Sequence, residues 1–416
     1  MMLRSLPFVS ILFFAMGCVT PYEPLPPLGT NVGVGRLDAD EEALWKQSRE
    51  LQYQIEVSGL LFEDPKLDAY LSKLLQRVTP PELAEASLTP QARVVSNVNI
   101  HGYSFANGVI YIHTALLSRM QNEAQLAALL SRELAHIVHR HALRGHRDKR
   151  LRADTLAWIG VGATLVDGGG EAKLLAQAAS ITTAAGFHHH LETVADEKGL
   201  AILHDAGYPV QSTLGLYEAS LTHLAEVHAQ GIWGWAPFTP PPQISARISG
   251  YETLIARDYA RKKPSRSPMA DTAGFRRRVH TATLRQCDLE LAVGLFISAE
   301  TCARLATESR PTDPNGWMLL GRALAGQRSR PIEGKRLPSL KAVRNAFEQV
   351  LILDVRHADA TRELGMSFYR TTGTQRTPDA SAEARRYFRR YLQLAPAAGD
   401  GDYVRGYLRE LEAEAR

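Results

Sequence analysis

One run of five residues constrains this chain more than any other segment. Residues 132–136 read Arg-Glu-Leu-Ala-His, which is the spacing of the helical metal-binding motif His-Glu-x-x-His with Arg in place of its first His. Two His residues four positions apart project from the same face of a helix, so they can bind one metal ion together. Arg132 cannot take part, because a guanidinium stays protonated and has no acceptor atom to offer a metal. This one substitution therefore decides what chemistry the helix can support.

The residues around this run predict a helix. Leu126, Leu130, Leu134 and Ile137 fall on one face at helical spacing. We therefore expect a helix that begins near Asn122 and buries its leucine face. That helix would hold Glu133 and His136 at a fixed spacing.

A second helix further along the chain is expected to complete the site. Glu192 and Asp196 are four positions apart, so they share a helix face. In a metal site of this kind Glu192 would be the third ligand, and Asp196 would orient a ligand imidazole. Glu133, beside the missing His, would take the proton from a metal-bound water. Gly199, one turn beyond Asp196, has no side chain and would let the two helices approach closely.

With their surroundings, these residues resemble the HtpX and CAAX-prenyl-protease family of zinc metallopeptidases. The resemblance spans roughly residues 41–256 and includes the residues that follow His136 and Asp196. It implies a mostly helical domain with a small sheet, with Glu133 as general base and with His136 and Glu192 as zinc ligands. It also implies a strand that lies at a sheet edge and pairs with substrate, formed here by Asn107, Gly108, Val109, Ile110 and Tyr111.

The resemblance is strongest to periplasmic members of that family, which carry a C-terminal tetratricopeptide domain and act in outer-membrane protein assembly and quality control. Two departures put hydrolysis in doubt. Arg132 replaces a ligand, and Thr239-Pro240-Pro241 stands where many relatives have a His near the active site. A guanidinium a few ångströms from a dication would be strongly repelled in a cleft of low dielectric constant.

Two hypotheses about the metal follow from Arg132. In the first, Arg132 pairs with Glu192, Asp196 or Glu133 and replaces the missing positive charge, so zinc is absent or weakly bound. In the second, Arg132 points outward and another His completes a zinc site. The candidates for that role are His101, His139 and the run His188, His189 and His190.

The first residues have the pattern of a lipoprotein signal. Arg4 precedes a short apolar stretch, residues 6–16, and Ala15-Met16-Gly17-Cys18 resembles the bacterial lipobox. We expect cleavage after residue 17, lipidation of Cys18 and attachment to the outer membrane on its periplasmic side. Residues 18–40 are rich in Pro and Gly and predict a flexible tether. A plain secretory signal is the alternative.

The second half of the chain predicts helical repeats. Residues 257–282 are basic and contain two prolines, and we interpret them as a solvated linker between domains. Residues 283–416 show a loose period of about 41 to 44 residues, in which Gly321 and Gly365 hold equivalent places. This resembles a degenerate tetratricopeptide array, whose surface often holds partner proteins. Cys287 and Cys302 lie in this region, and the sequence leaves open whether they form a disulfide.

The fold class that follows is α+β and mostly α: a gluzincin-type metallopeptidase domain with a small sheet, then an α-helical tetratricopeptide-like domain. A net charge of +4 is too weak to indicate nucleic-acid binding. We expect a periplasmic lipoprotein that binds unfolded or outer-membrane polypeptides and is impaired in cleaving them. The alternatives are an active zinc endopeptidase with a different third ligand, and a scaffold that recruits envelope proteins through its repeats.

Overall fold

A computed structural model describes residues 25–30, 37–151, 174, 177–178, 181, 189–230, 241–263, 271–370 and 377–414. Several predicted features lie outside these residues: the signal peptide, Cys18, most of the tether, His188, and Thr239 with Pro240. Among the described helices, none is both long and apolar enough to cross a membrane.

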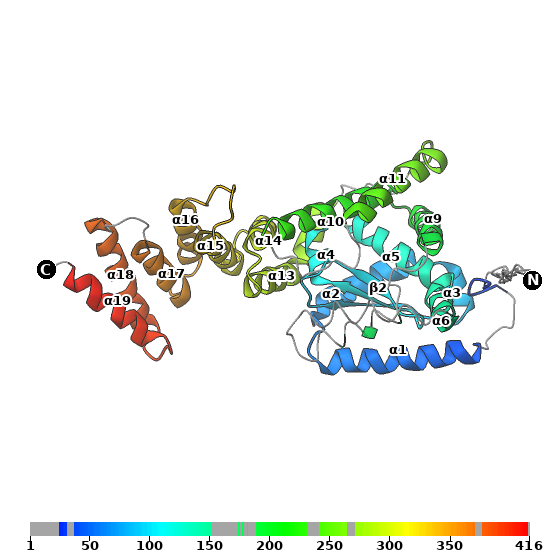
Figure 1. Ribbon diagram of the computed structural model, residues 1–416, viewed down its shortest axis with the longest axis horizontal. Helices are drawn as coiled ribbons and strands as arrows, with labels where there is room; N and C mark the ends of the chain where they lie inside the picture. Colours follow the sequence, from blue (N-terminus) through cyan, green and yellow to red (C-terminus); the bar gives the residue numbers. More distant parts are fainter. Residues whose placement is uncertain are drawn as a thin grey trace, which may run out of the picture.

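The first domain is a three-stranded sheet covered by helices on both faces (Figure 1). Helix α1 runs along one side of the sheet, and α5, α9, α10 and α11 lie on the other. The elements are α1 (Ala39–Val57), α2 (Pro65–Val78), α3 (Pro81–Glu85), β1 (Gln91–Val95), β2 (Gly102–Ser104), β3 (Val109–His113), α4 (Thr114–Arg119), α5 (Glu123–Val138), α6 (His141–Leu151), α9 (His189–Asp205), α10 (Ser212–His228) and α11 (Pro241–Asp258).

Helix α5 forms as the sequence predicts. The side chain of Asn122 accepts a hydrogen bond from the backbone N–H of Gln125, which satisfies one of the free donors at the helix start. Leu126, Leu130 and Ile137 are buried in the core beneath the sheet. Because nearly every residue of α5 is buried, the helix is held on all sides and its polar side chains cannot turn to solvent.

The sheet order corrects one prediction. The order is β1-β3-β2, with β1 parallel and β2 antiparallel to β3, so the strand expected at the edge is central among the described strands. Gly108 has a positive φ of 90°, which allows the tight turn that folds β3 back along β2. Ile110 and Ile112 are fully buried as a result. The outer strand of the described sheet on this side is β2.

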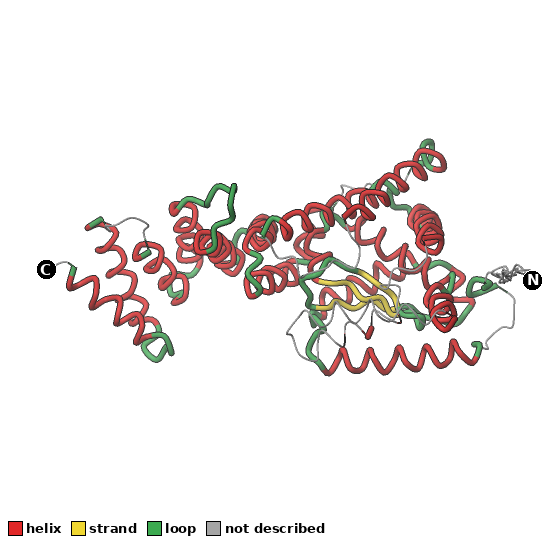
Figure 2. Tube along the Cα trace, in the orientation of Figure 1, coloured by secondary structure: helices red, strands yellow, loops and turns green. Residues whose placement is uncertain are grey.

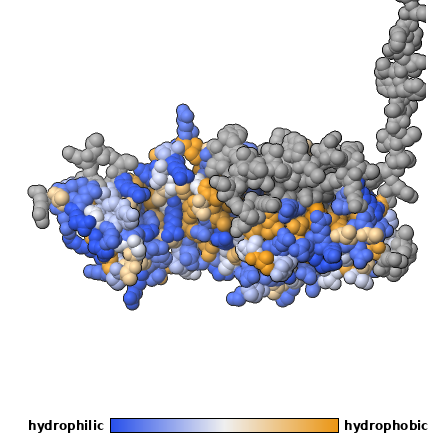
Figure 3. All heavy atoms as spheres, turned by 60° about the horizontal axis from the view of Figure 1, so that its bottom comes forward, coloured by the Kyte–Doolittle hydropathy of each residue, from blue (hydrophilic) through white to orange (hydrophobic). Residues whose placement is uncertain are grey.

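The second half of the chain is a row of helices that extends away from the sheet (Figure 2). The elements are α12 (Thr272–Arg278), α13 (His280–Ala292), α14 (Phe296–Ser309), α15 (Pro314–Ser329), α16 (Leu340–Leu353), α17 (Ala358–Tyr369), α18 (Pro378–Leu394) and α19 (Gly401–Ala413). Hydrophilic side chains cover most of the far end of this row in Figure 3. Hydrophobic ones gather toward the first domain, beside residues drawn in grey.

A recurring contact supports the predicted repeat. A Cβ added at Gly321 would lie 2.4 Å from a ring carbon of Phe347, and one at Gly365 would lie 2.6 Å from ring carbons of Phe388. Each glycine thus lets an aromatic ring of the following helix pack against the backbone. The two contacts join α15 to α16 and α17 to α18 in the same way.

The predicted basic linker is in part a folded element, which is a second correction. Helix α12 and the start of α13 fall within residues 257–282. Phe275, Val279 and Ala282 belong to the same apolar core as the leucines of α5. The Arg278 guanidinium also lies over the ring of Tyr70, 5.2 Å from its centre. These apolar residues, at helical spacing, pack this segment against the first domain despite the basic residues around them.

Candidate functional site

The site lies where α5 and α9 cross at close range. A Cβ on Gly199 would lie 2.9 Å from the Cα of Arg132, so only glycine allows this approach. The close contact that the sequence predicted for Gly199 is confirmed. It brings Glu192 and Asp196 of α9 against Arg132, Glu133 and His136 of α5.

Arg132 points into the site and contacts all three carboxylates. Its Nη1 donates to Glu133 Oε1 at 2.9 Å, its Nε donates to Asp196 Oδ1 at 2.9 Å, and its Nη2 donates to Glu192. The side chain is only 11% exposed, so these ion pairs are shielded from water. The salt bridges that the first hypothesis predicted for Arg132 are present.

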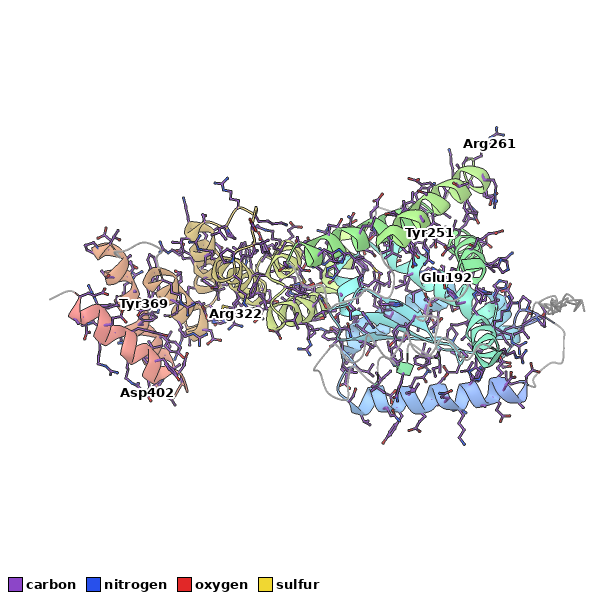
Figure 4. All side chains as sticks on the ribbon, in the orientation of Figure 1. Glu192, Tyr251, Arg261, Arg322, Tyr369 and Asp402 are labelled. Atoms are coloured by element: carbon purple, nitrogen blue, oxygen red, sulfur yellow. The ribbon has the colours of Figure 1, made fainter. Side chains whose placement is uncertain are left out.

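A second cation, Arg247 of α11, was not predicted from the sequence and contacts two of these carboxylates, Glu192 and Asp196. Arg247 Nη2 donates to Glu192 Oε2 at 2.7 Å, and Tyr251 Oη donates to Asp196 Oδ1 at 2.7 Å. Figure 4 shows Glu192 and Tyr251 on neighbouring helices on the same side of the sheet. Arg247 and Tyr251 are four residues apart, and this spacing on one helix face is the signal that could have revealed them.

Charge and burial set the protonation of the site. Burial alone would raise the pKa of Glu192, but the charges of Arg132 and Arg247 hold it below its ordinary value. Burial opposes the charge on Arg132, yet Tyr217 and the three carboxylates raise its pKa well above the usual range. Burial and the Arg132 charge lower the pKa of His136 far below normal, so its ring is neutral. The site therefore holds an ionised Glu192, two charged guanidiniums and a neutral His136 ring.

His136 keeps part of the geometry of a metal ligand. Its Nε2 is buried without a hydrogen-bond partner in the described part of the chain, 3.9 Å from Glu192 Oε1. Its Nδ1 lies 3.0 Å from Nδ1 of His141. A pocket beside it is lined by Glu41, Ser104, Phe105, Ala106, His136, Ile137, Arg140, Ala142 and Leu143.

The other predicted ligands do not complete a metal site in the described residues. His101 Nδ1 contacts the carbonyl of Gly102, and burial, with the nearby His113, lowers the pKa of His101 to about 3. His139 lies beside His141, with ring centres 5.9 Å apart, and His190 is exposed. No three His, Cys, Asp or Glu side chains among the described residues are grouped so that they could hold a metal ion.

The residues present therefore do not fit a zinc ion in the usual position. Three ligands and one open position are needed, and a guanidinium bonded to three carboxylates stands at the first ligand position. Glu133 is also engaged, because Ser104 Oγ donates to its Oε2 at 2.9 Å. The arrangement holds its acids together by ion pairs, with no metal required for that purpose.

A small sheet, a Glu-x-x-His helix and a crossing Glu-x-x-x-Asp helix define a gluzincin-type metallopeptidase domain. Comparison with known proteins agrees: residues 65–262 match the model of Peptidase family M48. The domain in this chain therefore belongs to peptidase family M48.

The chain is similar to several proteins named beta-barrel assembly-enhancing protease. Over 200 residues the chain is 29% identical to the beta-barrel assembly-enhancing protease of Escherichia coli (strain K12), which covers 46% of this chain and 39% of that protein. Over 203 residues it is 28% identical to the protein of that name in Yersinia pestis, covering 47% and 40%. Over 246 residues it is 25% identical to a putative beta-barrel assembly-enhancing protease of Vibrio cholerae, covering 58% and 48%. The matched part spans less than half the length of each relative.

Proposed function

We propose that this protein works in the bacterial envelope and binds unfolded or outer-membrane polypeptides in an M48 cleft that no longer cleaves them efficiently. The observation that carries the proposal is the triple ion pair of Arg132 with Glu133, Glu192 and Asp196. The names of its relatives, which refer to assembly of β-barrels, support the choice of client.

The loss of hydrolysis follows from charge. A dication placed next to Arg132 would be repelled, and expelling the guanidinium would break its ion pairs with three carboxylates. Glu133 accepts hydrogen bonds from Arg132 and from Ser104, so its carboxylate is already committed. Both effects disfavour zinc binding and proton removal from water.

Client binding is supported by the sheet. Strand β2 is outermost in the described sheet and packs against α5 beside the site. An extended polypeptide can add to an outer strand through main-chain hydrogen bonds, and this mode of binding needs no metal and no catalytic base. In this proposal β2 (Gly102–Ser104) takes the substrate-pairing role that the sequence predicted for residues 107–111.

The proposed organisation keeps the limits derived from the sequence. Residues 1–17 would be a signal peptide, Cys18 the lipid-bearing residue and 18–40 a tether to the outer membrane. Residues 41–256 would form the peptidase-type domain and 283–416 the repeats that meet other envelope proteins. The segment between them, 257–282, would join the two, with its α12 part docked on the first domain.

One observation favours a second candidate, an active zinc endopeptidase with a different third ligand. His136 Nε2 has no hydrogen-bond partner in the described residues and faces Glu192 Oε1 at 3.9 Å, so two of three ligand positions survive. This candidate requires Arg132 to leave its three carboxylates. The scaffold alternative instead places binding on the helical row, where Ile352 and Tyr403 are each 71% exposed.

One experiment separates the three. Binding of fluorescent, reduced and carboxymethylated casein to the full-length protein is followed by anisotropy, and its cleavage by gel, with and without a zinc chelator. The proposal predicts binding without cleavage, unchanged by chelator and unchanged in Glu133→Gln. Cleavage that chelator and Glu133→Gln both abolish would establish the endopeptidase. Binding that Ile352→Asp and Tyr403→Asp abolish would establish the scaffold.

A further inference from the structure

Two cysteines meet in the core of the helical row. Cys287 on α13 and Cys302 on α14 are both fully buried, and their Sγ atoms are 2.6 Å apart. They are 15 positions apart in the sequence, and the segment between them includes the turn that joins the two helices. The two side chains therefore face each other across one helical hairpin.

Polar contacts on both sides of this pair fix how the two helices align. At one end His280 Nδ1 lies 2.7 Å from Ser309 Oγ. At the other end Ser298 Oγ donates to Glu290 Oε1 at 2.9 Å. Since both ends of the hairpin are held, the sulfur atoms can join without any change in the alignment of α13 and α14.

The hairpin also carries the junction with the peptidase-type domain. Arg119, at the end of α4, donates from Nη2 to Glu290 Oε1 at 3.0 Å and to Ser298 Oγ at 2.7 Å. Its side chain is 5% exposed and that of Glu290 is fully buried. The guanidinium of one domain is thus inserted where the two helices of the other meet, close to the cysteines.

We propose that Cys287 and Cys302 form an intrachain disulfide that fixes α13 against α14 and so holds the Arg119 junction in place. Each thiol loses a proton and one electron, and a small-molecule or protein disulfide is reduced to two thiols. One cysteine thiolate attacks that disulfide and releases the first thiol. The second cysteine then attacks the mixed disulfide and releases the other. The disulfide rests on the proposed function in one respect: it requires the oxidising compartment of the bacterial envelope.

Burial determines when the bond can form and how long it lasts. The thiolate is the attacking species, and burial raises the pKa of the Cys287 thiol well above normal. Exchange therefore takes place during folding, before the hairpin core closes. Once formed, the bond is out of reach of reductants in solution until the helices separate.

The full-length protein is tested by unfolding it, reducing it, and refolding it in either oxidised or reduced glutathione. Refolded protein is alkylated in denaturant and digested with trypsin. Both cysteines lie in the single tryptic peptide 286–304. After oxidised refolding we expect this peptide to carry no alkyl label until it is reduced, and to carry two labels after reduced refolding.

Thermal unfolding of the same samples is the second readout. The oxidised protein should melt roughly 5–10 °C above the reduced protein, because the bond closes a loop of 15 residues. The double variant Cys287→Ala/Cys302→Ala should melt at one temperature in both buffers. A doubly labelled peptide after oxidised refolding, or equal melting of the two wild-type samples, would overturn the proposal. The result does not depend on peptide binding or on zinc, so it stands apart from the proposed function.

Discussion

Two arginines of the peptidase-type domain, Arg132 and Arg119, are largely shielded from solvent and form ion pairs in different ways. Arg132 uses all three of its nitrogens, each bonded to a different carboxylate. Arg119 uses only Nη2, and its Nε and Nη1 are buried without a hydrogen-bond partner in the described residues. Both meet acids in places from which water is largely excluded, yet only Arg132 has a hydrogen-bond partner for each of its three nitrogens.

The two arginines also differ in the groups that surround them. The three carboxylates around Arg132 converge on its guanidinium, as the acids of a metal site converge on the ion. Arg119 instead connects α4 to the hairpin of α13 and α14, through Glu290 and Ser298. Arg132 thus has an acidic partner for each of its nitrogens within one site, whereas Arg119 pairs across a junction with a single nitrogen.

Removal of Arg132 should have the largest effect. Arg132→Met removes the cation that pairs with Glu133, Glu192 and Asp196, so we expect a loss of about 4–5 kcal/mol in the free energy of unfolding. Urea denaturation followed by circular dichroism measures it. Arg304→Met, which removes an exposed pair with Glu300, is the control and should cost less than about 1 kcal/mol. Equal losses in both variants would mean that the triple ion pair does not form in solution.

Removal of Arg119 should cost somewhat less, about 3 kcal/mol, because it balances fewer acids. The buried Glu290 loses its counter-charge in Arg119→Met. Neutralising the acid as well, in Arg119→Met/Glu290→Gln, should recover at least half of the loss, which denaturation of both variants will measure. Strictly additive losses would show that the two side chains do not interact across the junction.

Acid should weaken the junction through His223, by about 1–2 kcal/mol at pH 5. His223 Nδ1 lies 3.1 Å from Ser298 Oγ, and burial, with the Arg119 charge, lowers its pKa to about 4. The unfolded chain binds the proton first, near pH 6.5, so stability falls as the pH drops from there to about 4. Unfolding midpoints at pH 7 and pH 5 should differ less in His223→Gln than in the wild type. If the midpoint falls equally in both proteins, His223 does not cause the loss of stability in acid.

The sequence predicted the centre of the site well, because helix geometry is local. The spacing of Glu133 and His136 and the shared face of Glu192 and Asp196 follow from residues within two turns of each other. Gly199 was recognisable because it lies one turn from Asp196 and has no side chain. What it missed is non-local. The partner strands of Val109–His113 and the arrival of Arg247 depend on how distant segments pack, and a single sequence does not record that packing.

The segment 272–282 shows a different limit. Its arginines dominate its composition and indicated a solvated linker, but Phe275 and Val279, four residues apart, anchor it in the core. Helical spacing of a few apolar residues carried more information than the number of charges. The equivalence of Gly321 and Gly365, by contrast, could be predicted because each repeat packs mainly on its neighbour.

The metal content of the purified full-length protein tests the central claim most directly, with Arg132→His prepared and measured beside the wild type. We expect less than about a tenth of an equivalent of zinc in the wild type, because Arg132 already balances the three acids. Arg132→His should gain zinc if the other ligands are still in place. One tightly held equivalent of zinc in the wild type, retained through dialysis against a weak chelator, would contradict the claim that a guanidinium has taken the place of the metal.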